Sequence, residues 1–384
     1  MSWPLVKISD FCQTGSGGTP SRDIPEYYEG DIPWIKSGDL RENIVTSATE
    51  FISQEAINKS SAKIVSQGAI LVAMYGATVG RMALLGIDAA TNQAVCNVVP
   101  DASKADTKYV YYALLSKVPD FLRSAIGGAQ PNISQGLIRS TEIPLPPLPE
   151  QKRIAAILDK ADAIRRKRQQ AIQLADDFLR AVFLDMFGDP VTNPKGWPVD
   201  KFGNVFDVRD GTHDSPSYVS SGFPLITSKN IKNGEIDMLD VNYISKEDYE
   251  LINRRSKVDV GDILMPMIGT IGNPAIVRDE PLFAIKNVAL IKLGRSSLPA
   301  EFVLALLNGP LLEAAVQQKS RGGTQKFLGL GDIRDLNCYL PDERLVSKYI
   351  GIANKVRQFA SAYRKADEAG LEGSLSQKAF SGHL

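Results

Sequence analysis

Few residues of this 384-residue chain have the types and spacing that catalysis requires. The two histidines, His213 and His383, have no cysteine or second histidine at metal-ligand spacing, so no zinc site is predicted. The sequence contains no G-x-x-x-x-G-K-[S/T] phosphate loop, and the glycines of 15–18 lack dinucleotide-binding spacing. It also lacks a G-x-S-x-G elbow and any Asn-Pro-Pro-Tyr-like stretch of the kind that amino-methyltransferases use. These observations favour a protein with no catalytic residues, no metal and no bound cofactor of its own.

One pattern resembles the Mg²⁺-binding motif of nucleases. Pro119-Asp120 is followed by Glu150-Gln151-Lys152, which loosely fits two carboxylates and a lysine gathered around a metal ion. Glu150 falls at an expected helix start, however, where an acidic side chain suits the helix dipole. Asp120 belongs to a different helical segment. We therefore interpret the pattern as structural.

Composition gives no direct support for nucleic-acid binding. Lys and Arg total 44 and Asp and Glu total 44, so the net charge is zero and any basic patch must be local. The three cysteines form no C-x-x-C pair, which favours a reduced, cytoplasmic protein. The longest apolar stretch, 69–87, is interrupted by Gly76, Gly80 and Arg81, so no membrane span is predicted.

The chain aligns with itself at an offset of about half its length. The matching segments, in order, are 30–40 with 221–231, 51–53 with 243–245, 68–71 with 261–264, 75–80 with 268–272, 92–94 with 286–288, 127–130 with 322–325, and 148–151 with 340–343. Seven matches in the same order indicate a duplicated unit of about 190 residues. Such a unit is far longer than a solenoid repeat, so two related domains are predicted.

Each half is expected to be a β-rich domain followed by a long helix. Short β-branched runs bounded by turn residues predict strands in the first half at 32–36, 64–65, 70–75, 81–85 and 94–99. Helical spacing at 106–123 recurs at 300–318. These patterns predict an α+β fold with an internal repeat.

The long helices stand out by composition. Ile143–Pro149 is proline-rich and predicts an extended connector, whereas Glu150–Phe187 has no proline or glycine and predicts a helix about 55 Å long. The second copy begins at Asp342. Because a lone amphipathic helix cannot bury its apolar stripe, we expect the two to pack antiparallel. The alternative is that each lies on its own domain. The predicted seam consists of Ile154, Ile157, Ile164, Phe178, Val182, Val346, Tyr349, Val356 and Tyr363.

Several motifs stand in an order typical of one known family. They are Gly17-Gly18-Thr19-Pro20, Asp31–Ile35, Gly76–Gly80, Asn92-Gln93-Ala94, Ile143–Gln151 and Gln377–Gly382. With them the whole chain resembles the specificity subunits of type I restriction–modification systems. The resemblance implies two target-recognition domains separated by two long antiparallel coiled-coil helices with a pseudo-twofold internal repeat. The expected segments are recognition domain 1 at 1–148, helix 1 at 149–188, recognition domain 2 at 189–340 and helix 2 at 341–384.

The resemblance also implies a function. Each domain would bind one half of a bipartite target in double-stranded DNA, and the helices would set the spacing and dock two methyltransferase subunits. Restriction/translocase subunits would complete the complex, and S-adenosylmethionine, ATP and Mg²⁺ would be bound by partner subunits. The alternative is a stand-alone two-domain DNA-binding or scaffold protein without a methyltransferase. A self-contained nuclease–methyltransferase fusion is disfavoured by the missing motifs.

Polar, glycine-rich loops recur in both halves and supply candidate DNA contacts, because such side chains bind phosphates and base edges. Pairing by residue type places Lys229 and Asn230 opposite Lys36 and Ser37. The alternative is that these segments are ordinary solvated loops. The candidates are Thr19, Ser21, Arg22, Lys36, Ser37, Thr78, Arg81, Gln130 and Asn132 in the first half, and Thr212, His213, Lys229, Asn230, Thr270, Arg321, Thr324, Gln325 and Lys326 in the second.

Overall fold

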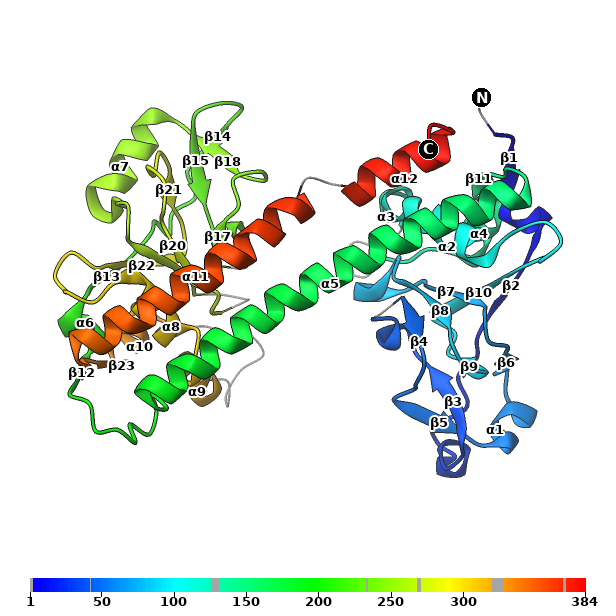
Figure 1. The fold of residues 1–384 in the computed structure, drawn as a ribbon, viewed down its shortest axis with the longest axis horizontal. Helices are drawn as coiled ribbons and strands as arrows, with labels where there is room; N and C mark the ends of the chain where they lie inside the picture. Colours follow the sequence, from blue (N-terminus) through cyan, green and yellow to red (C-terminus); the bar gives the residue numbers. More distant parts are fainter. Residues whose placement is uncertain are drawn as a thin grey trace. The chain divides into compact units, whose positions relative to one another are not determined.

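The chain folds into two compact units in a computed structural model that describes residues 3–41, 43–125, 131–232, 234–267, 271–319, 328–368 and 371–384. Unit 1 comprises Met1–Arg168 and Lys365–Leu384, and unit 2 comprises Gln169–Arg364. The long helix α5, Leu148–Phe187, contributes to both (Figure 1). Within the described ranges, every helix is too short or too polar to cross a membrane.

Unit 1 contains two main sheets. The first has the order β2 (Cys12–Ser16), β10 (Val95–Pro100), β7 (Ile70–Ala73), β8 (Met82–Leu85) and β4 (Ile44–Val45). The second has the order β5 (Glu50–Ile52), β3 (Ile32–Ile35), β9 (Ala89–Thr91) and β6 (Ile64–Val65). A separate pair joins β1 (Leu5–Lys7) to β11 (Glu142–Pro144). All five strands predicted for this half are present, as β3, β6, β7, β8 and β10.

Unit 2 repeats this strand pairing. One sheet has the order β13 (Asp207–Asp210), β22 (Val288–Lys292), β19 (Ile263–Pro266) and β20 (Ala275–Ile276), which matches β2-β10-β7-β8. The other has the order β14 (Tyr218–Val219), β18 (Asn242–Ile244), β15 (Phe223–Ile226) and β21 (Ala284–Ile285). Its β15–β21 pair is parallel, as is β3–β9. The pairs β12 (Val199–Lys201) with β23 (Asn337–Tyr339) and β16 (Ile231–Lys232) with β17 (Glu235–Ile236) complete the unit. The predicted internal repeat is therefore confirmed as a repeat of topology.

Two predicted domain helices are each broken in the structure. Segment 106–123 forms α2 (Thr107–Ser116) and α3 (Val118–Ser124), with Pro119 in the first turn of α3. Segment 300–318 forms α8 (Ala300–Leu307) and α9 (Pro310–Lys319). Proline has no N–H to donate and is tolerated in a first turn, so both breaks fall where a new helix starts. The other domain helices are α1 (Gln54–Lys59), α4 (Gln135–Ser140), α6 (Phe202–Val205), α7 (Lys246–Ser256) and α10 (Leu330–Arg334).

The start of α5 is anchored by Gln151, which is fully buried. Its side-chain oxygen accepts from the backbone N–H of Asp106 (2.8 Å), and its amide donates to the carbonyls of Lys104 (3.0 Å) and Pro146 (2.7 Å). The helix begins at Leu148 and includes Pro149, so the predicted extended connector is shorter than expected. A buried amide with all these partners satisfied fixes the first turn of the helix to the α2 end of domain 1.

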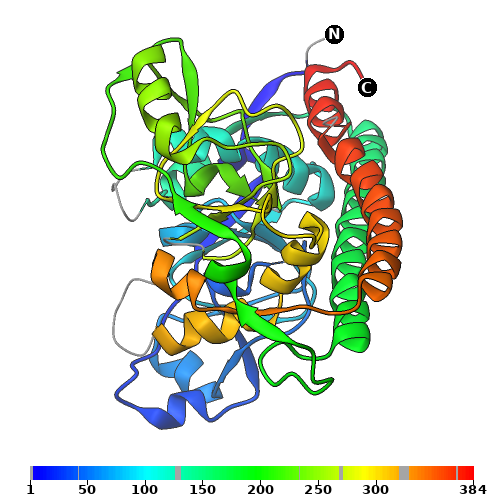
Figure 2. The ribbon, with the colours of Figure 1, turned by 90° about the vertical axis from the view of Figure 1, so that its left-hand side faces the viewer.

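Within unit 2 the C-terminal half of α5 packs against α11, Glu343–Glu368 (Figures 1 and 2). The ring of Phe187 lies 5.7 Å from that of Tyr349, whereas Asp176 pairs with Arg364 at 3.5 Å. Increasing residue numbers on α5 thus meet decreasing numbers on α11. The predicted antiparallel packing of the two helices is confirmed for this segment.

The predicted seam is wrong at two positions of α5. Ile164 is 46% exposed and Phe178 is 51% exposed, whereas Leu179 and Phe183 are buried. A strict alternation of three and four residues rotates by about 20° per heptad relative to a straight helix. When the pattern is extended across the polar middle of α5, the predicted positions therefore move off the buried face. Ile154, Val346 and Tyr349 are buried as predicted. Ile157, Val182, Val356 and Tyr363 are partly buried.

Unit 1 receives the C-terminal helix α12, Leu371–Ser381. Ala379 is buried in the core that contains Ile154 of α5, and the ring of Phe380 contacts that of Tyr109 at 5.7 Å. The Arg153 guanidinium donates to the carbonyl of Leu384 at 2.8 Å. The core of domain 1 is therefore completed by the last residues of the chain.

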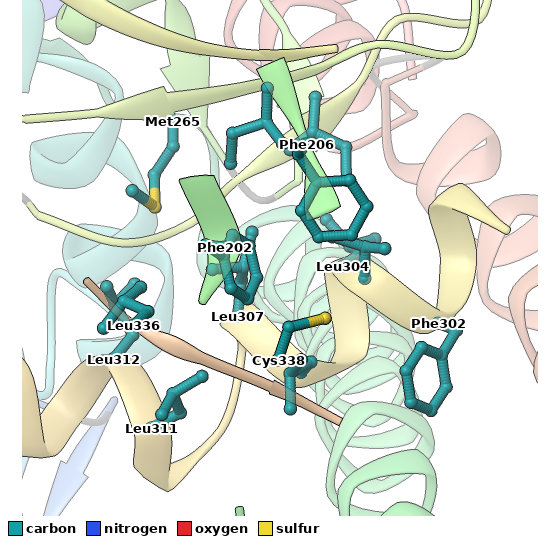
Figure 3. Packing of buried hydrophobic residues seen from close by; sticks show 14 of the residues in the cluster. Phe202, Phe206, Met265, Phe302, Leu304, Leu307, Leu311, Leu312, Leu336 and Cys338 are labelled. Atoms are coloured by element: carbon teal, nitrogen blue, oxygen red, sulfur yellow. The ribbon is translucent and has the colours of Figure 1, made fainter. Parts of the chain in front are cut away.

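The core of unit 2 lies between its β13-containing sheet and the helices that cover it (Figure 3). Phe202 of α6 and Phe206, which follows that helix, meet Leu304 and Leu307 of α8, with Cys338 of β23 beside them. These side chains are all buried. The apolar packing fixes the sheet whose strand ends carry the polar loops described next.

Candidate nucleic-acid interface

Several strands of unit 1 end at one place. Ser16 at the end of β2 lies opposite Cys96 near the start of β10, and β7 ends beside the same point. Ile35 at the end of β3 lies opposite Thr91 at the end of β9 in a parallel pair. The loops that follow therefore gather along one edge, which we name the rim of unit 1. It comprises residues 17–22, 36–39, 75–81, 91–94 and 131–132.

Gly17 lies where the two sheets of unit 1 meet. Its N–H donates to the carbonyl of Val95 (3.1 Å), and the N–H of Gly18 donates to the carbonyl of Thr91 (2.9 Å). A Cβ on Gly17 would lie 2.0 Å from the Thr91 carbonyl oxygen. Only glycine allows the backbone this approach, which holds the loop of Thr19 to Arg22 against the junction.

Unit 2 builds an equivalent rim from residues 211–215, 227–230 and 285–287. The N–H of Gly211 donates to the carbonyl of Val288 (3.1 Å), and that of Thr212 donates to the carbonyl of Ile285 (3.0 Å). A Cβ on Gly211 would lie 2.2 Å from the Ile285 carbonyl oxygen. Gly211 therefore takes the place of Gly17, although the sequences around them scarcely match.

The predicted correspondence of Lys229 with Lys36 is wrong. The backbone N–H of Lys36 donates to Asp39 Oδ2 (2.9 Å), and in the same local fold the N–H of Thr227 donates to Asn230 Oδ1 (3.1 Å). Thr227 thus replaces Lys36, and Asn230 replaces Asp39. The shared feature is a capping box, in which a side chain returns to the backbone three residues earlier.

Asn230 cannot act as a base-reading side chain in this conformation. It is 1% exposed, and its amide donates to the carbonyls of Asp240 (2.8 Å) and Asp237 (3.3 Å). Lys229 beside it is exposed and pairs with Asp240 at 3.3 Å. Of these two candidates, Lys229 alone offers its side chain to solvent.

In unit 1 an acidic residue organises the basic candidates. Glu50 of β5 accepts from Arg22 Nη2 (2.6 Å) and from Lys36 Nζ. The Arg22 guanidinium also lies over the ring of Tyr28, 4.1 Å from its centre, and 5.4 Å from the ring centre of Trp34. The hydrogen bond from Lys36, with that from Arg22, lowers the pKa of Glu50 below its usual value and keeps it ionised. Arg22 is held in one orientation, with its side chain 57% exposed.

The other described candidates of unit 1 stay near the surface. The hydroxyl of Ser21 donates to Asp23 (3.3 Å), and the hydroxyl of Thr78 donates to the carbonyl of Tyr75 (3.0 Å). Arg81 and Asn132 are exposed, and Thr19 and Ser37 are half-buried. Six candidates lie outside the described residues: Gln130, Thr270, Arg321, Thr324, Gln325 and Lys326.

In unit 2 His213 is exposed and sits in a polar cluster. Its Nε2 lies 2.7 Å from Asp210 Oδ2, and its Nδ1 lies 2.8 Å from Asn287 Oδ1. Asp210 also accepts from Arg255 Nη2 at 2.6 Å. The hydrogen bonds to Asn287 and then to Asp210 raise the pKa of His213 above its usual value. Thr212, the other candidate here, accepts through its hydroxyl oxygen from the N–H of Asp214 at 3.1 Å.

Sequence reasoning missed Glu50, Asp210 and Arg255. Two of these contacts depend on tertiary structure: Arg255 lies at the end of α7, 45 residues from Asp210, and Glu50 lies 28 residues from Arg22. Asp210 contacts His213 only three residues along the chain. Asn287 did carry a signal, because it falls in a segment that matches Asn92-Gln93-Ala94 in the first half.

The nuclease-like pattern has a structural account. Asp120 pairs with Arg123 on its own helix α3, and Glu150 pairs with Arg153 in the first turns of α5 at 2.8 Å. Both carboxylates are thus in ion pairs three residues along a helix. In the part of the chain that the structure describes, no group of three or more His, Cys, Asp or Glu side chains is arranged to hold a metal ion.

Known proteins resemble this chain over most of its length. Residues 2–174 match the type I restriction modification DNA specificity domain. The MjaIX specificity subunit of Methanocaldococcus jannaschii is 27% identical over 376 residues, covering 90% of this chain and 85% of that protein. The EcoR124I/EcoR124II specificity subunit of Escherichia coli is 34% identical over 154 residues, which is 38% of each chain.

A solved structure shares the fold. The S subunit of a type I restriction–modification system from M. genitalium aligns over 99% of this chain and 96% of its own length, with a TM-score of 0.55 and 17% identity. The repeated β-rich domains, the long antiparallel helices and the sequence matches all agree. In sequence and in fold, this chain is similar to the specificity subunits of type I restriction–modification systems.

Proposed function

We propose that this chain is the DNA sequence-specificity subunit of a type I restriction–modification complex, in which each unit presents its rim to one half of a bipartite target. The observation that supports this is one backbone frame with two different sets of side chains. The rim of unit 1 holds Arg22 and Lys36, both paired with Glu50 of β5, and that of unit 2 holds His213 and Asn287. A fixed frame with different polar groups is suited to reading two different half-sequences, because base edges differ in their donors and acceptors.

The chemistry belongs to partner subunits in this proposal. Two methyltransferase subunits bind S-adenosylmethionine, and restriction/translocase subunits bind ATP and Mg²⁺. The zero net charge of the chain fits this division, because partner subunits can supply phosphate contacts that this chain lacks. In unit 2, Leu174 and Phe178 of α5 and Phe359 of α11 are more than half exposed, which offers apolar surface for a methyltransferase subunit.

The test is to co-express the chain with its methyltransferase subunit and map methylated adenines across a genome. We expect one split motif methylated on both strands, with each half of fixed sequence. The purified chain alone should transfer no methyl group, cut no DNA and hydrolyse no ATP. Methyl transfer by the isolated chain would contradict the proposal. Sequence-specific DNA binding without capture of a methyltransferase would favour the stand-alone binder instead.

Replacing Arg22 with lysine should relax one position in the half-target of unit 1. Lysine cannot present the planar, paired donors of an arginine that is stacked on Tyr28 and held by Glu50. The expected loss is about 1–3 kcal/mol of discrimination at that base pair. Methylome mapping would detect it as one degenerate position. The matched control is Arg123→Lys on α3, outside the rim, which should leave both halves unchanged.

A further inference from the structure

His213 lies between two hydrogen-bond acceptors. Its Nε2 faces Asp210 Oδ2 at 2.7 Å, and its Nδ1 faces Asn287 Oδ1 at 2.8 Å. An ionised carboxylate and an amide oxygen can only accept, so both ring nitrogens must carry a hydrogen. The neutral ring has one N–H, whereas the imidazolium has two. With the Asn287 amide in this orientation, the geometry favours the charged form of His213.

The charges packed against the ring come from two elements, β13 and α7. Asp210, at the end of β13, is 5% exposed and also accepts from Arg255 of α7 at 2.6 Å. The guanidinium of Arg209, next to Asp210 on β13, binds Asp207 and the backbone carbonyl of Arg255. One nearly buried carboxylate is thus shared by an arginine and an imidazolium.

Two further charged residues lie in the same loops. Asp214 follows His213 and is exposed. Lys286, next to Asn287, donates to Ser215 Oγ at 2.6 Å. The bonds to Asn287 and Asp210 raise the pKa of His213 above its ordinary value of 6.5, although desolvation and the charge of Arg255 act against them.

Asn287 is fixed by its backbone as well as by His213. Its φ is 53°, in the left-handed region that asparagine tolerates, and its N–H donates to the carbonyl of Thr212 at 3.2 Å. With Oδ1 held by His213, the amide turns its NH₂ group, with two donors, away from the ring. Such donors match the acceptor atoms of a base edge, such as N7 and O6 of guanine or O4 of thymine.

We propose that His213 is a positioning residue that, as an imidazolium, fixes the Asn287 amide so that unit 2 offers N–H donors to an acceptor edge in its half-target. This inference rests on the proposed function. Once the ring is neutral, one of its nitrogens turns a lone pair toward an acceptor, and the amide is released to rotate. It can then offer its oxygen, which accepts from the amino groups of adenine or cytosine. Discrimination at one base pair of that half is therefore pH-dependent.

The direction with pH follows from the raised pKa. The hydrogen bond from the His213 imidazolium to Asn287 is fully present below the ordinary pKa of 6.5. It is lost as the pH rises through the higher pKa that His213 has in the folded protein. Wild-type discrimination at that base pair is expected to fall by about fivefold or more at alkaline pH, the low end of what one base contact provides.

The protonation state can be measured without DNA. The chain has only two histidines, so the full chain labelled with ¹⁵N-histidine gives two sets of imidazole nitrogen signals. The set that disappears in His213→Gln belongs to His213. We expect both nitrogens of His213 to be protonated at neutral pH, with a midpoint above 6.5 that falls in Asn287→Ala. A midpoint at or below 6.5 would overturn the proposal.

Sequence reading is tested in the complex with the methyltransferase subunit. Duplexes with a randomised stretch are selected at about pH 6 and at about pH 9, on either side of the ordinary histidine pKa. In the wild type, one position of one half should lose its preference at the higher pH. His213→Gln and Asn287→Ala should lack that preference at both values, and combining them should add nothing further. His383→Gln is the matched control and should behave as the wild type.

The outcomes separate this inference from the proposed function. A split preference that is the same at both pH values in the wild type overturns the role of His213 and leaves the proposed function standing. No sequence preference at either pH overturns both. Should His213→Gln fail to fold, Asn287→Ala carries the test, because its shortened side chain leaves the Asp210–Arg255 pair in place.

Discussion

Replacing Phe187 with alanine is expected to lower the free energy of unfolding by about 3–5 kcal/mol, whereas Phe178→Ala should change it by less than about 1 kcal/mol. Both residues lie on α5 within unit 2. Phe187 is fully buried, with its ring 5.0 Å from that of Phe302 and 5.7 Å from that of Tyr349. Phe178 is 51% exposed. The pair compares one residue type on two faces of one helix.

Urea unfolding of the full chain, followed by tryptophan fluorescence, would measure the difference. Trp197 is a suitable probe, because its indole N–H donates to the carbonyl of Phe187 at 2.9 Å and its ring lies 6.5 Å from the Phe187 ring. Removing the buried ring leaves a cavity where α5 meets α8 and α11. If the two variants are equally destabilised, the helix seam runs through Phe178 as the sequence pattern predicted, and the observed packing is wrong.

The repeat could be predicted from the sequence because it is marked by short motifs that depend only on neighbouring residues. Turn glycines, the Phe-Pro or Ile-Pro strand starts and the long helices survive even where the two halves differ, and all of them depend on neighbours in the chain. The strands missed in unit 1, such as β2 with its Gly15 and β9 with two alanines, each hold a single β-branched residue beside residue types that are depleted in strands. They are strands because their neighbours pair with them.

The candidate site could be predicted only in part. Gly17, Arg22 and His213 were placed on rim loops by motif and recurrence. Glu50 was not predicted, since it comes from β5 and only the fold brings it beside Arg22. Asp210 stands three residues before His213 at the end of β13, but no motif marked it. The error at Lys229 has a different origin: the match of 30–40 with 221–231 already places Thr227 opposite Lys36, and pairing the two lysines by type departed from it. Side chains that organise other side chains leave little trace in spacing.

Gly17→Ala and Gly211→Ala are expected to damage one half-target each. The new methyl group on Gly17 would lie 2.0 Å from the Thr91 carbonyl oxygen, and that on Gly211 would lie 2.2 Å from the Ile285 carbonyl oxygen. Backbone atoms cannot rotate away as a side chain does, so the sheet junction itself must shift. The expected cost is about 3 kcal/mol, the upper end of what overpacking costs. Gly294→Ala is the control, because an added Cβ there meets no atom within 4 Å and the residue lies outside both rims.

Methylome mapping of the complex would separate these effects. Because each glycine holds the rim of its own unit, Gly17→Ala should blur or abolish methylation specificity in the half read by Arg22 and its neighbours. Gly211→Ala should do the same in the half read by His213 and Asn287, and Gly294→Ala should leave both halves as in the wild type. The unaffected half must keep its sequence in each variant, since the two junctions share no residue. If both glycine variants change the same half, the two rims form one composite reading site and the two-reader assignment fails.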